Sequence, residues 1–265
     1  MQFGMPTLIE IRQLEDTMQL CRELGLDFVE LNMNLPDYQA DRLEDTDKFQ
    51  RLKERYQVGY TIHLDENLNV CDFNREVAEA YLRTVERTIA AAKAIGAPVV
   101  NMHMNHGVHF TLPDRKVELF SVYRQEYEDA WKRFRELCEA KIGDADIRIC
   151  IENTDGFREY EKQALCCLLE SPVFGLTWDI GHSHSARDAD EAFFMEHAEN
   201  LLHFHIHDAA GEKNHLALGA GEIDLPQRLR IAEKYHCRCV LETKTVEALR
   251  ESVEWLKKQV HETAQ

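Results

Sequence analysis

Apolar and polar residues alternate in several short segments of the chain, and the clearest case is the segment 202–207. It reads LHFHIH, so three histidines alternate with leucine, phenylalanine and isoleucine. Alternate residues of a β-strand point to opposite faces, so His203, His205 and His207 are expected to share one face. The pattern predicts a strand with a hydrophobic layer on one side and water, a metal ion or a substrate on the other.

The same alternation recurs in five other segments, and each one ends in a polar side chain on the face opposite the apolar one. In residues 147–153 (IRICIEN), for example, isoleucines occupy one face and Glu152 lies on the other. Each of these polar residues is of a type that binds metal ions. The six segments place His63, His103, Glu152, Asp179, His205 and Glu242 at corresponding positions.

Helical periodicity separates these strands. The stretch 74–95 carries apolar residues at helical spacing, and Gly96 follows it as a stop signal. With further strands at 2–5 and 28–34, strands and helices alternate eight times, which predicts a parallel sheet. Eight such units predict a single closed (β/α)8 TIM barrel over residues 1–265, with the six polar residues at the carboxyl ends of the strands. Other helices are expected at 11–24, 41–56, 117–141, 160–170, 189–198 and 225–235, and the sixth strand is expected to extend to His182.

The composition is that of a water-soluble globular protein, because 44% of the 265 residues are hydrophobic and 30% are charged. The net charge of −17 disfavours general binding to nucleic acid or to an anionic membrane. The first residues do not resemble a signal peptide, and no apolar run is long enough to span a bilayer. The eight cysteines include no CxxC pair. We therefore expect a cytoplasmic protein with reduced thiols, which is compatible with a homo-oligomer.

Five pieces of the chain read IENTDG, DIGH, HIHDA, NHLALGAGEID and LETK, beginning at residues 151, 179, 205, 214 and 241. In this order they resemble the xylose-isomerase-like barrel superfamily, which includes sugar isomerases and epimerases, inosose dehydratases and endonuclease IV. The resemblance implies one divalent metal ion at Glu152, Asp179, His205 and Glu242. Three carboxylates and one imidazole suit Mn²⁺, Mg²⁺, Co²⁺ or Zn²⁺. The alternative for each glutamate is a carboxylate paired with Arg or Lys.

Four further residues are candidates for substrate binding. His182 follows Asp179 in a DxxH motif, and the resemblance implies a substrate contact, as in the epimerases, or a metal ligand, as in endonuclease IV. A hydrogen-bonding loop histidine is the alternative. His63 and His103 match additional metal ligands of endonuclease IV and would contact substrate in a one-metal enzyme. Glu30 points inward by parity and is expected to hydrogen-bond a substrate.

For residues near these candidates we expect mainly structural roles. His203 is expected one layer deeper in the barrel, as a core histidine with a hydrogen-bond partner, and His207 at the solvated rim. Trp178 should face the helices. The glycines of LGAGEID (218–224) either approach a phosphate, as loops after the seventh and eighth barrel strands often do, or form a tight turn into the next helix.

The leading functional hypothesis is a metal-dependent sugar or polyol isomerase or epimerase. Removal of a proton next to a carbonyl gives an enediolate, which a divalent cation stabilises. The resemblance implies that Glu152 and Glu242 are both metal ligands and the acid/base pair. A small sugar or polyol is the expected partner. An inosose-type dehydratase shares this first step and is an alternative.

The rival enzyme is an endonuclease-IV-like phosphodiesterase that acts on abasic DNA. Where its motif has Asp-x-His, this chain has Lys213 two residues before His215, and a lysine cannot replace a carboxylate at a metal ion. Asp65 and Glu66, after the third strand, oppose the approach of DNA phosphates. We therefore expect no nucleic-acid partner, and expect Lys213 to contact a substrate hydroxyl or phosphate. A barrel that only binds a ligand is a third alternative, which metal content would distinguish.

Overall fold

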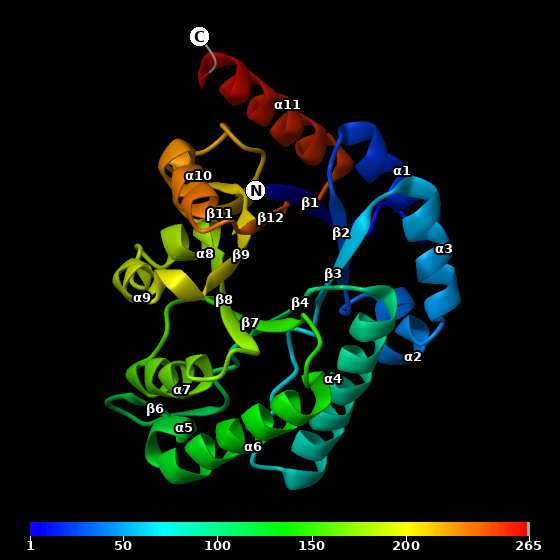
Figure 1. Ribbon diagram of the computed structural model, residues 1–265. Coiled ribbons are helices and arrows are strands. Elements are labelled where there is room, and N and C mark those ends of the chain that lie inside the picture. The colour runs from blue at the N-terminus through cyan, green and yellow to red at the C-terminus, as the bar shows by residue number, and fades with distance from the viewer. Residues whose placement is uncertain (264–265) are drawn as a thin grey trace.

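The computed structural model describes residues 1–263, and the side chains of residues 1–259. Within this range eight parallel strands close into one barrel that is surrounded by helices (Figure 1), which confirms the predicted (β/α)8 fold. The barrel strands are β1 (Gln2–Pro6), β2 (Phe28–Asn32), β3 (Gly59–His63), β4 (Val99–His103), β7 (Arg148–Glu152), β8 (Phe174–Asp179), β9 (Leu201–Ile206) and β12 (Arg238–Leu241).

The helices follow the strands along the chain. Asn74 caps the longest helix by accepting the Glu76 N–H at 3.2 Å, and Gly96 ends it with a φ of 67°, as the sequence predicted. The helices are α1 (Leu14–Leu24), α2 (Ala40–Leu43), α3 (Thr46–Tyr56), α4 (Arg75–Ile95), α5 (Leu119–Val122), α6 (Arg124–Ile142), α7 (Glu159–Leu169), α8 (Ile180–Ser185), α9 (Glu191–Glu196), α10 (Leu225–Lys234) and α11 (Val246–Thr263).

Short elements lie in the connections between the barrel strands and the helices. Two 3₁₀ turns, η1 (Pro36–Tyr38) and η2 (Ala198–Asn200), lie beside helices. Two antiparallel hairpins follow barrel strands: β5 (His109–Thr111) with β6 (Lys116–Glu118), and β10 (Asp208–Ala210) with β11 (Lys213–Leu216). None of the helices in the described range is long and apolar enough to cross a membrane.

Strand register decides which polar side chains meet. His103 is the partner of Glu152 across β4 and β7, and His205 is the partner of Asp179 across β9 and β8. The residues that alternate with them pack outward. Trp178, for example, is fully buried and stacks on Phe194 with ring centroids 4.8 Å apart, so its predicted place against the helices is confirmed.

Three predicted boundaries were wrong. The helix expected at 41–56 is divided into α2 and α3, and the one expected at 117–141 is preceded by β6 and α5 and begins at Arg124. The sixth strand ends at Asp179 rather than at His182. The reason is local, because the Asp179 side chain accepts the His182 N–H at 2.6 Å and caps α8.

Candidate metal and substrate site

Four side chains converge at the carboxyl ends of β7, β8, β9 and β12. Each offers one ligand atom, and these atoms all lie within 4.8 Å of one another. His205 Nδ1 lies 3.0 Å from Glu152 Oε1, 3.3 Å from Glu242 Oε2 and 3.9 Å from Asp179 Oδ2. We call these four residues the quartet. Their convergence at one mouth is what strand parity predicted, and their role as metal ligands remains a prediction.

The chemistry of the quartet fits a divalent cation. Its members are between 0% and 8% exposed, and three are carboxylates. Among the described residues, Glu242 Oε2 has no hydrogen-bond partner although it is buried and faces the other three. A buried carboxylate oxygen without a partner is destabilising unless a positive charge lies beside it. Oxygen and imidazole ligands of this kind suit Mn²⁺, Mg²⁺, Co²⁺ or Zn²⁺.

The protonation states of these groups are strongly coupled to one another. Burial by itself would raise the pKa of Glu152, but the imidazoles of His205 and His103 outweigh it and hold the pKa well below its usual range. Burial would likewise lower the pKa of His205, but Glu152, Glu30 and Glu242 raise it well above its usual value. Protonated histidine therefore balances the carboxylates here, and a bound cation would take over that function with release of protons.

The second oxygen of Glu152 faces two more histidines. His63 Nε2 and His103 Nε2 each lie 3.2 Å from Glu152 Oε2, and the Asn101 amide also donates to this oxygen. Burial lowers the pKa of His63, but Glu152 outweighs burial and raises the pKa to about 9. Thr177 Oγ1 donates to Asn101 Oδ1 at 2.5 Å and so fixes the amide. Both predicted histidines thus lie at the mouth, beside Glu152.

His182 and His215 form a partly open pair on the other side of the quartet. Each ring donates from Nδ1 to a backbone carbonyl, His182 to Asn153 and His215 to Glu242, both at 3.1 Å. The ring centroids are 5.9 Å apart, and the side chains are 21% and 23% exposed. Because Nδ1 carries the proton, each Nε2 is left as an acceptor for a ligand.

Glu30 does not lie where an open substrate contact would be. It is 2% exposed and pairs with Thr61, one level below the strand ends. Thr61 Oγ1 and His203 Nε2 both lie 2.9 Å from its Oε2. His205 Nε2 lies 2.8 Å from its Oε1, close enough for an ionic contact but without hydrogen-bond alignment. The geometry makes Glu30 a support for His205, and it confirms that His203 is a core histidine.

The solvated position predicted for His207 was wrong. Its side chain is 0% exposed, and its Nε2 lies 3.1 Å from both oxygens of Asp179. The hairpin of β10 and β11 brings the His215 N–H to 3.0 Å from His207 Nδ1, with His215 at a φ of 56°. Both ring nitrogens are therefore engaged, so His207 orients Asp179 and has no lone pair left for a metal. Gly181 is required beside it, because a Cβ there would overlap the imidazole.

A lysine that the sequence analysis overlooked lies against the quartet. Lys244 Nζ is 2.8 Å from Glu242 Oε1, so the two oxygens of this carboxylate have different environments. Lys244 stands two residues after Glu242 in the LETK motif, and strand parity could have identified it. Lys213 is exposed on β11, and its predicted substrate contact remains a prediction.

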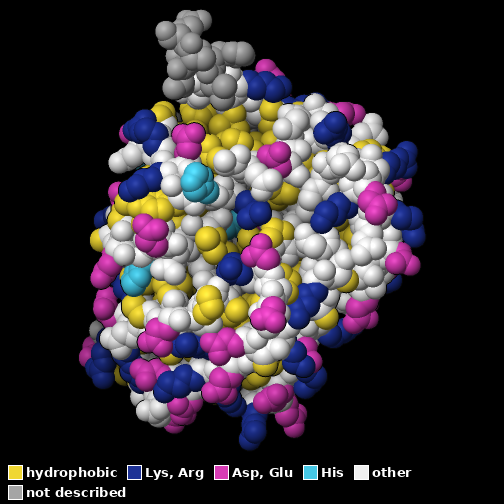
Figure 2. Space-filling model, in the orientation of Figure 1, with side chains coloured by type: hydrophobic (Ala, Val, Ile, Leu, Met, Phe, Trp, Pro, Cys, Tyr) yellow, Lys and Arg dark blue, Asp and Glu magenta, His cyan; other side chains and the backbone are white. Residues whose placement is uncertain are grey.

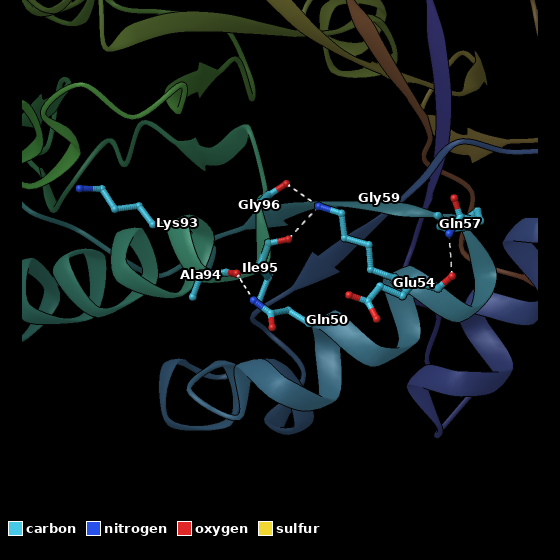
Figure 3. A pocket seen from close by; sticks show the side chains of 10 residues that line it. Gln50, Glu54, Gln57, Gly59, Lys93, Ala94, Ile95 and Gly96 are labelled. Carbon is cyan, nitrogen blue, oxygen red and sulfur yellow. Dashed lines mark hydrogen bonds between the residues drawn. The ribbon is translucent and has the colours of Figure 1, made fainter.

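A separate groove opens at the amino end of β3, with a cavity volume of about 610 Å³. Figure 3 shows Gln50 from α3 pointing toward the last residues of α4. Lys53 Nζ donates to the carbonyls of Ile95 at 2.9 Å and Gly96 at 3.2 Å, and Gln50 donates to Ala94 O at 2.7 Å. These contacts satisfy the carbonyl end of a helix and account for Lys53 and Gln50 in the groove.

The site can now be compared with known proteins. A family model described as xylose isomerase-like TIM barrel matches residues 18–259. Protein MJ1311 of Methanocaldococcus jannaschii is 28% identical over an alignment of 239 positions, which covers 84% of this chain and 76% of that protein. The crystal structure of a D-tagatose 3-epimerase-like protein is 26% identical and has a TM-score of 0.79, with 98% of this chain and 97% of that chain covered. The structure of the IolI protein with a bound zinc atom is 16% identical and has a TM-score of 0.73, with 98% of this chain and 96% of that chain covered. At this identity the similarity is one of fold.

Proposed function

The chain belongs to the xylose isomerase-like TIM barrel family, and we propose that it is a divalent-metal-dependent sugar or polyol isomerase or epimerase. The observation that carries this proposal is the pair of buried carboxylates, Glu152 and Glu242, whose oxygens approach His205 Nδ1 from two barrel strands at 3.0 and 3.3 Å. The likeness to a D-tagatose 3-epimerase-like protein supports a ketose as the substrate class.

The reaction requires a proton to leave one carbon of the substrate and another to be delivered. Glu152 and Glu242 reach the mouth from β7 and from the end of β12, with β8 and β9 between these strands. A carboxylate on each side of a bound ketose removes the proton next to the carbonyl and returns one to the opposite face, which inverts that carbon. A divalent cation held by the quartet supplies positive charge that stabilises the enediolate.

The remaining side chains position the substrate. His182 and His215 are 21% and 23% exposed and each leaves Nε2 as an acceptor, which suits a substrate hydroxyl. His103 is partly exposed and lies beside Glu152, where it can donate to a substrate oxygen. An inosose-type dehydratase uses the same proton removal but then expels a hydroxyl group, and product analysis separates it from an epimerase.

One observation favours a second candidate, a two-metal phosphodiesterase for abasic DNA. His63 Nε2 and His103 Nε2 both lie 3.2 Å from Glu152 Oε2, an arrangement that could hold a second cation. The charges oppose DNA binding. Figure 2 shows acidic side chains interspersed with basic ones over one face of the molecule, and the net charge is −17. We therefore propose that these histidines contact substrate.

The test is exchange of a substrate C–H proton with solvent deuterium by protein loaded with Mn²⁺ or Co²⁺, followed by NMR over a panel of ketoses and inososes. Glu152→Gln and Glu242→Gln should each lower the exchange rate by roughly 10³-fold, since each removes a proton-transfer group and a ligand. Glu222→Gln is the matched control, because Glu222 lies at the rim and is 58% exposed; it should change the rate less than about twofold. Full metal content with full exchange in Glu242→Gln, or efficient cleavage of abasic DNA by the unmodified protein, would contradict the proposal.

A further inference from the structure

The glycine-rich loop after the seventh barrel strand is folded around a carboxylate of the chain itself. Asp208 is 1% exposed, and its Oδ2 accepts the N–H groups of Gly219 at 3.0 Å and Gly221 at 2.9 Å. Its Oδ1 accepts the N–H groups of Ala209 at 2.9 Å and Ile223 at 3.2 Å. In TIM barrels the loops after strands seven and eight frequently bind phosphate through such amides. Here Asp208 occupies the position that an anion would take.

Two more amides of this loop also have acceptors. The Ala220 N–H donates to Ala217 O at 3.0 Å, and the Glu222 N–H donates to Ala209 O at 2.9 Å. A Cβ at Gly221 would overlap both Ala209 O and the Asp208 carboxylate, so the loop packs directly on these groups. The tight-turn interpretation of LGAGEID is therefore correct, and the phosphate-binding interpretation is wrong.

After the eighth barrel strand, β12, a carboxylate of the chain also lies at the amides of the connection. Val246 is the first residue of α11, and its N–H donates to Glu10 Oε2 at 2.6 Å. The Ala248 N–H donates to Thr245 Oγ1 at 3.2 Å. A helix amino terminus favours an anion, and here Glu10, from the connection between β1 and α1, provides it.

Cationic side chains near the mouth are paired with carboxylates. Lys244 contacts Glu242 at 2.8 Å, and Arg158 donates to both oxygens of Asp155 at 2.6 and 3.2 Å. Lys213 is exposed on β11, where an ammonium group in water adds little binding energy to a phosphate.

We propose that the substrate is an uncharged ketose or polyol and not its phosphate ester. A phosphate group at either loop would meet Asp208 or Glu10, and like charges at contact distance repel. Neither Asp208 nor Glu10 belongs to the metal quartet, so an uncharged sugar can bind there without displacing either carboxylate. This substrate class rests on the proposed isomerase or epimerase activity.

The first experiment compares free ketohexoses with their phosphate esters as substrates for deuterium exchange by the Mn²⁺-loaded protein. The expected kcat/KM is at least about tenfold higher for the free sugar than for its phosphate ester. This ratio corresponds to a free-energy difference of roughly one ion-pair contact. A higher kcat/KM for the ester would overturn the inference while leaving the proposed function intact. Absence of exchange with free sugars and esters alike would overturn the proposed function and this substrate class with it.

The second experiment needs no sugar and uses inorganic phosphate as the probe. Calorimetric titration of Mn²⁺-loaded protein is compared with that of Glu10→Ala, which exposes the amino terminus of α11. Both proteins carry the same metal, so any phosphate bound to the metal contributes equally. We expect phosphate to bind Glu10→Ala at least about tenfold more tightly, with kcat/KM for the free sugar changed less than about twofold. Equal phosphate binding by both proteins would overturn the role assigned to Glu10.

Discussion

At the amino end of the barrel the Lys53 ammonium group donates to two carbonyls at the end of α4, whereas at the carboxyl end Glu242 Oε2 is buried without a hydrogen-bond partner within the described part of the chain. Both regions are rich in polar side chains. In the groove of Figure 3 the cation that the helix end requires is a side chain of the protein. At the mouth three carboxylates gather around one imidazole, and their oxygen and nitrogen atoms form a set of ligands that suits a divalent cation.

The volume of a cavity therefore does not identify a functional site. The groove measures about 610 Å³, yet its Lys53 and Gln50 side chains find their partners at the carbonyl end of α4. The mouth is identified instead by buried carboxylates and an imidazole whose ligand atoms lie within 4.8 Å of one another, with groups such as His207 that orient the ligands and do not bind the metal themselves. Metal removal and substitutions at the two ends of the barrel should therefore affect the two regions differently.

Metal removal should have the largest effect, and only the mouth should respond to it. Binding to the folded state alone stabilises the protein by about 4 kcal/mol at a free-metal concentration 1,000 times Kd. A chelator should therefore lower Tm by roughly 10 °C for a chain of this size. Differential scanning calorimetry with and without chelator measures the shift. Lys53→Met should show the same shift and Glu242→Gln should show almost none; an unchanged Tm in chelator-treated unmodified protein would refute the metal site.

The barrel and the quartet could be predicted because they depend on local patterns. Strand parity identified the inward face, and the parallel sheet brought Glu152, Asp179, His205 and Glu242 to the same end. The predicted length of β8 was wrong because the Asp179 side chain caps α8 and the strand ends at this residue. Such a cap depends on one hydrogen bond, and the alternation of residue types carries no information about it.

The depth of Glu30 and the burial of His207 have a different cause. Parity tells which face a side chain occupies, but strand stagger decides its level along the barrel axis, and Glu30 lies one level below the mouth. His207 is buried because the hairpin of β10 and β11 folds back over it, and the His215 N–H that holds its ring comes from eight residues further along the chain. Neither the stagger nor the path of the hairpin is visible in residue periodicity.

A smaller effect is expected from removing the group that orients Asp179. His207→Ala should weaken binding of Co²⁺ by roughly 10- to 100-fold, as is typical when a partner that orients a metal ligand is lost. His207→Gln retains an N–H donor and should recover part of the affinity. His184→Ala is the control, because the His184 side chain lies 3.0 Å from the exposed Glu222 and is not a member of the quartet; this variant should bind Co²⁺ as the unmodified protein does. Titration followed by the visible spectrum of Co²⁺ reports both affinity and ligand geometry; equal Co²⁺ affinity and spectra in His207→Ala and His184→Ala would show that His207 is only a packing residue.

The smallest effect should come from the groove. Lys53→Met keeps the aliphatic stem but removes the ammonium group from Ile95 O and Gly96 O, and this should lower the free energy of unfolding by about 1 kcal/mol. The loss should appear in urea denaturation, with metal affinity and deuterium exchange unchanged within about twofold. The reason is that the carbonyls of α4 regain water as a partner, whereas no substrate group depends on them. If Lys53→Met instead abolished exchange while its folding remained intact, the groove would be coupled to the mouth, and the separation between the two ends of the barrel would be wrong.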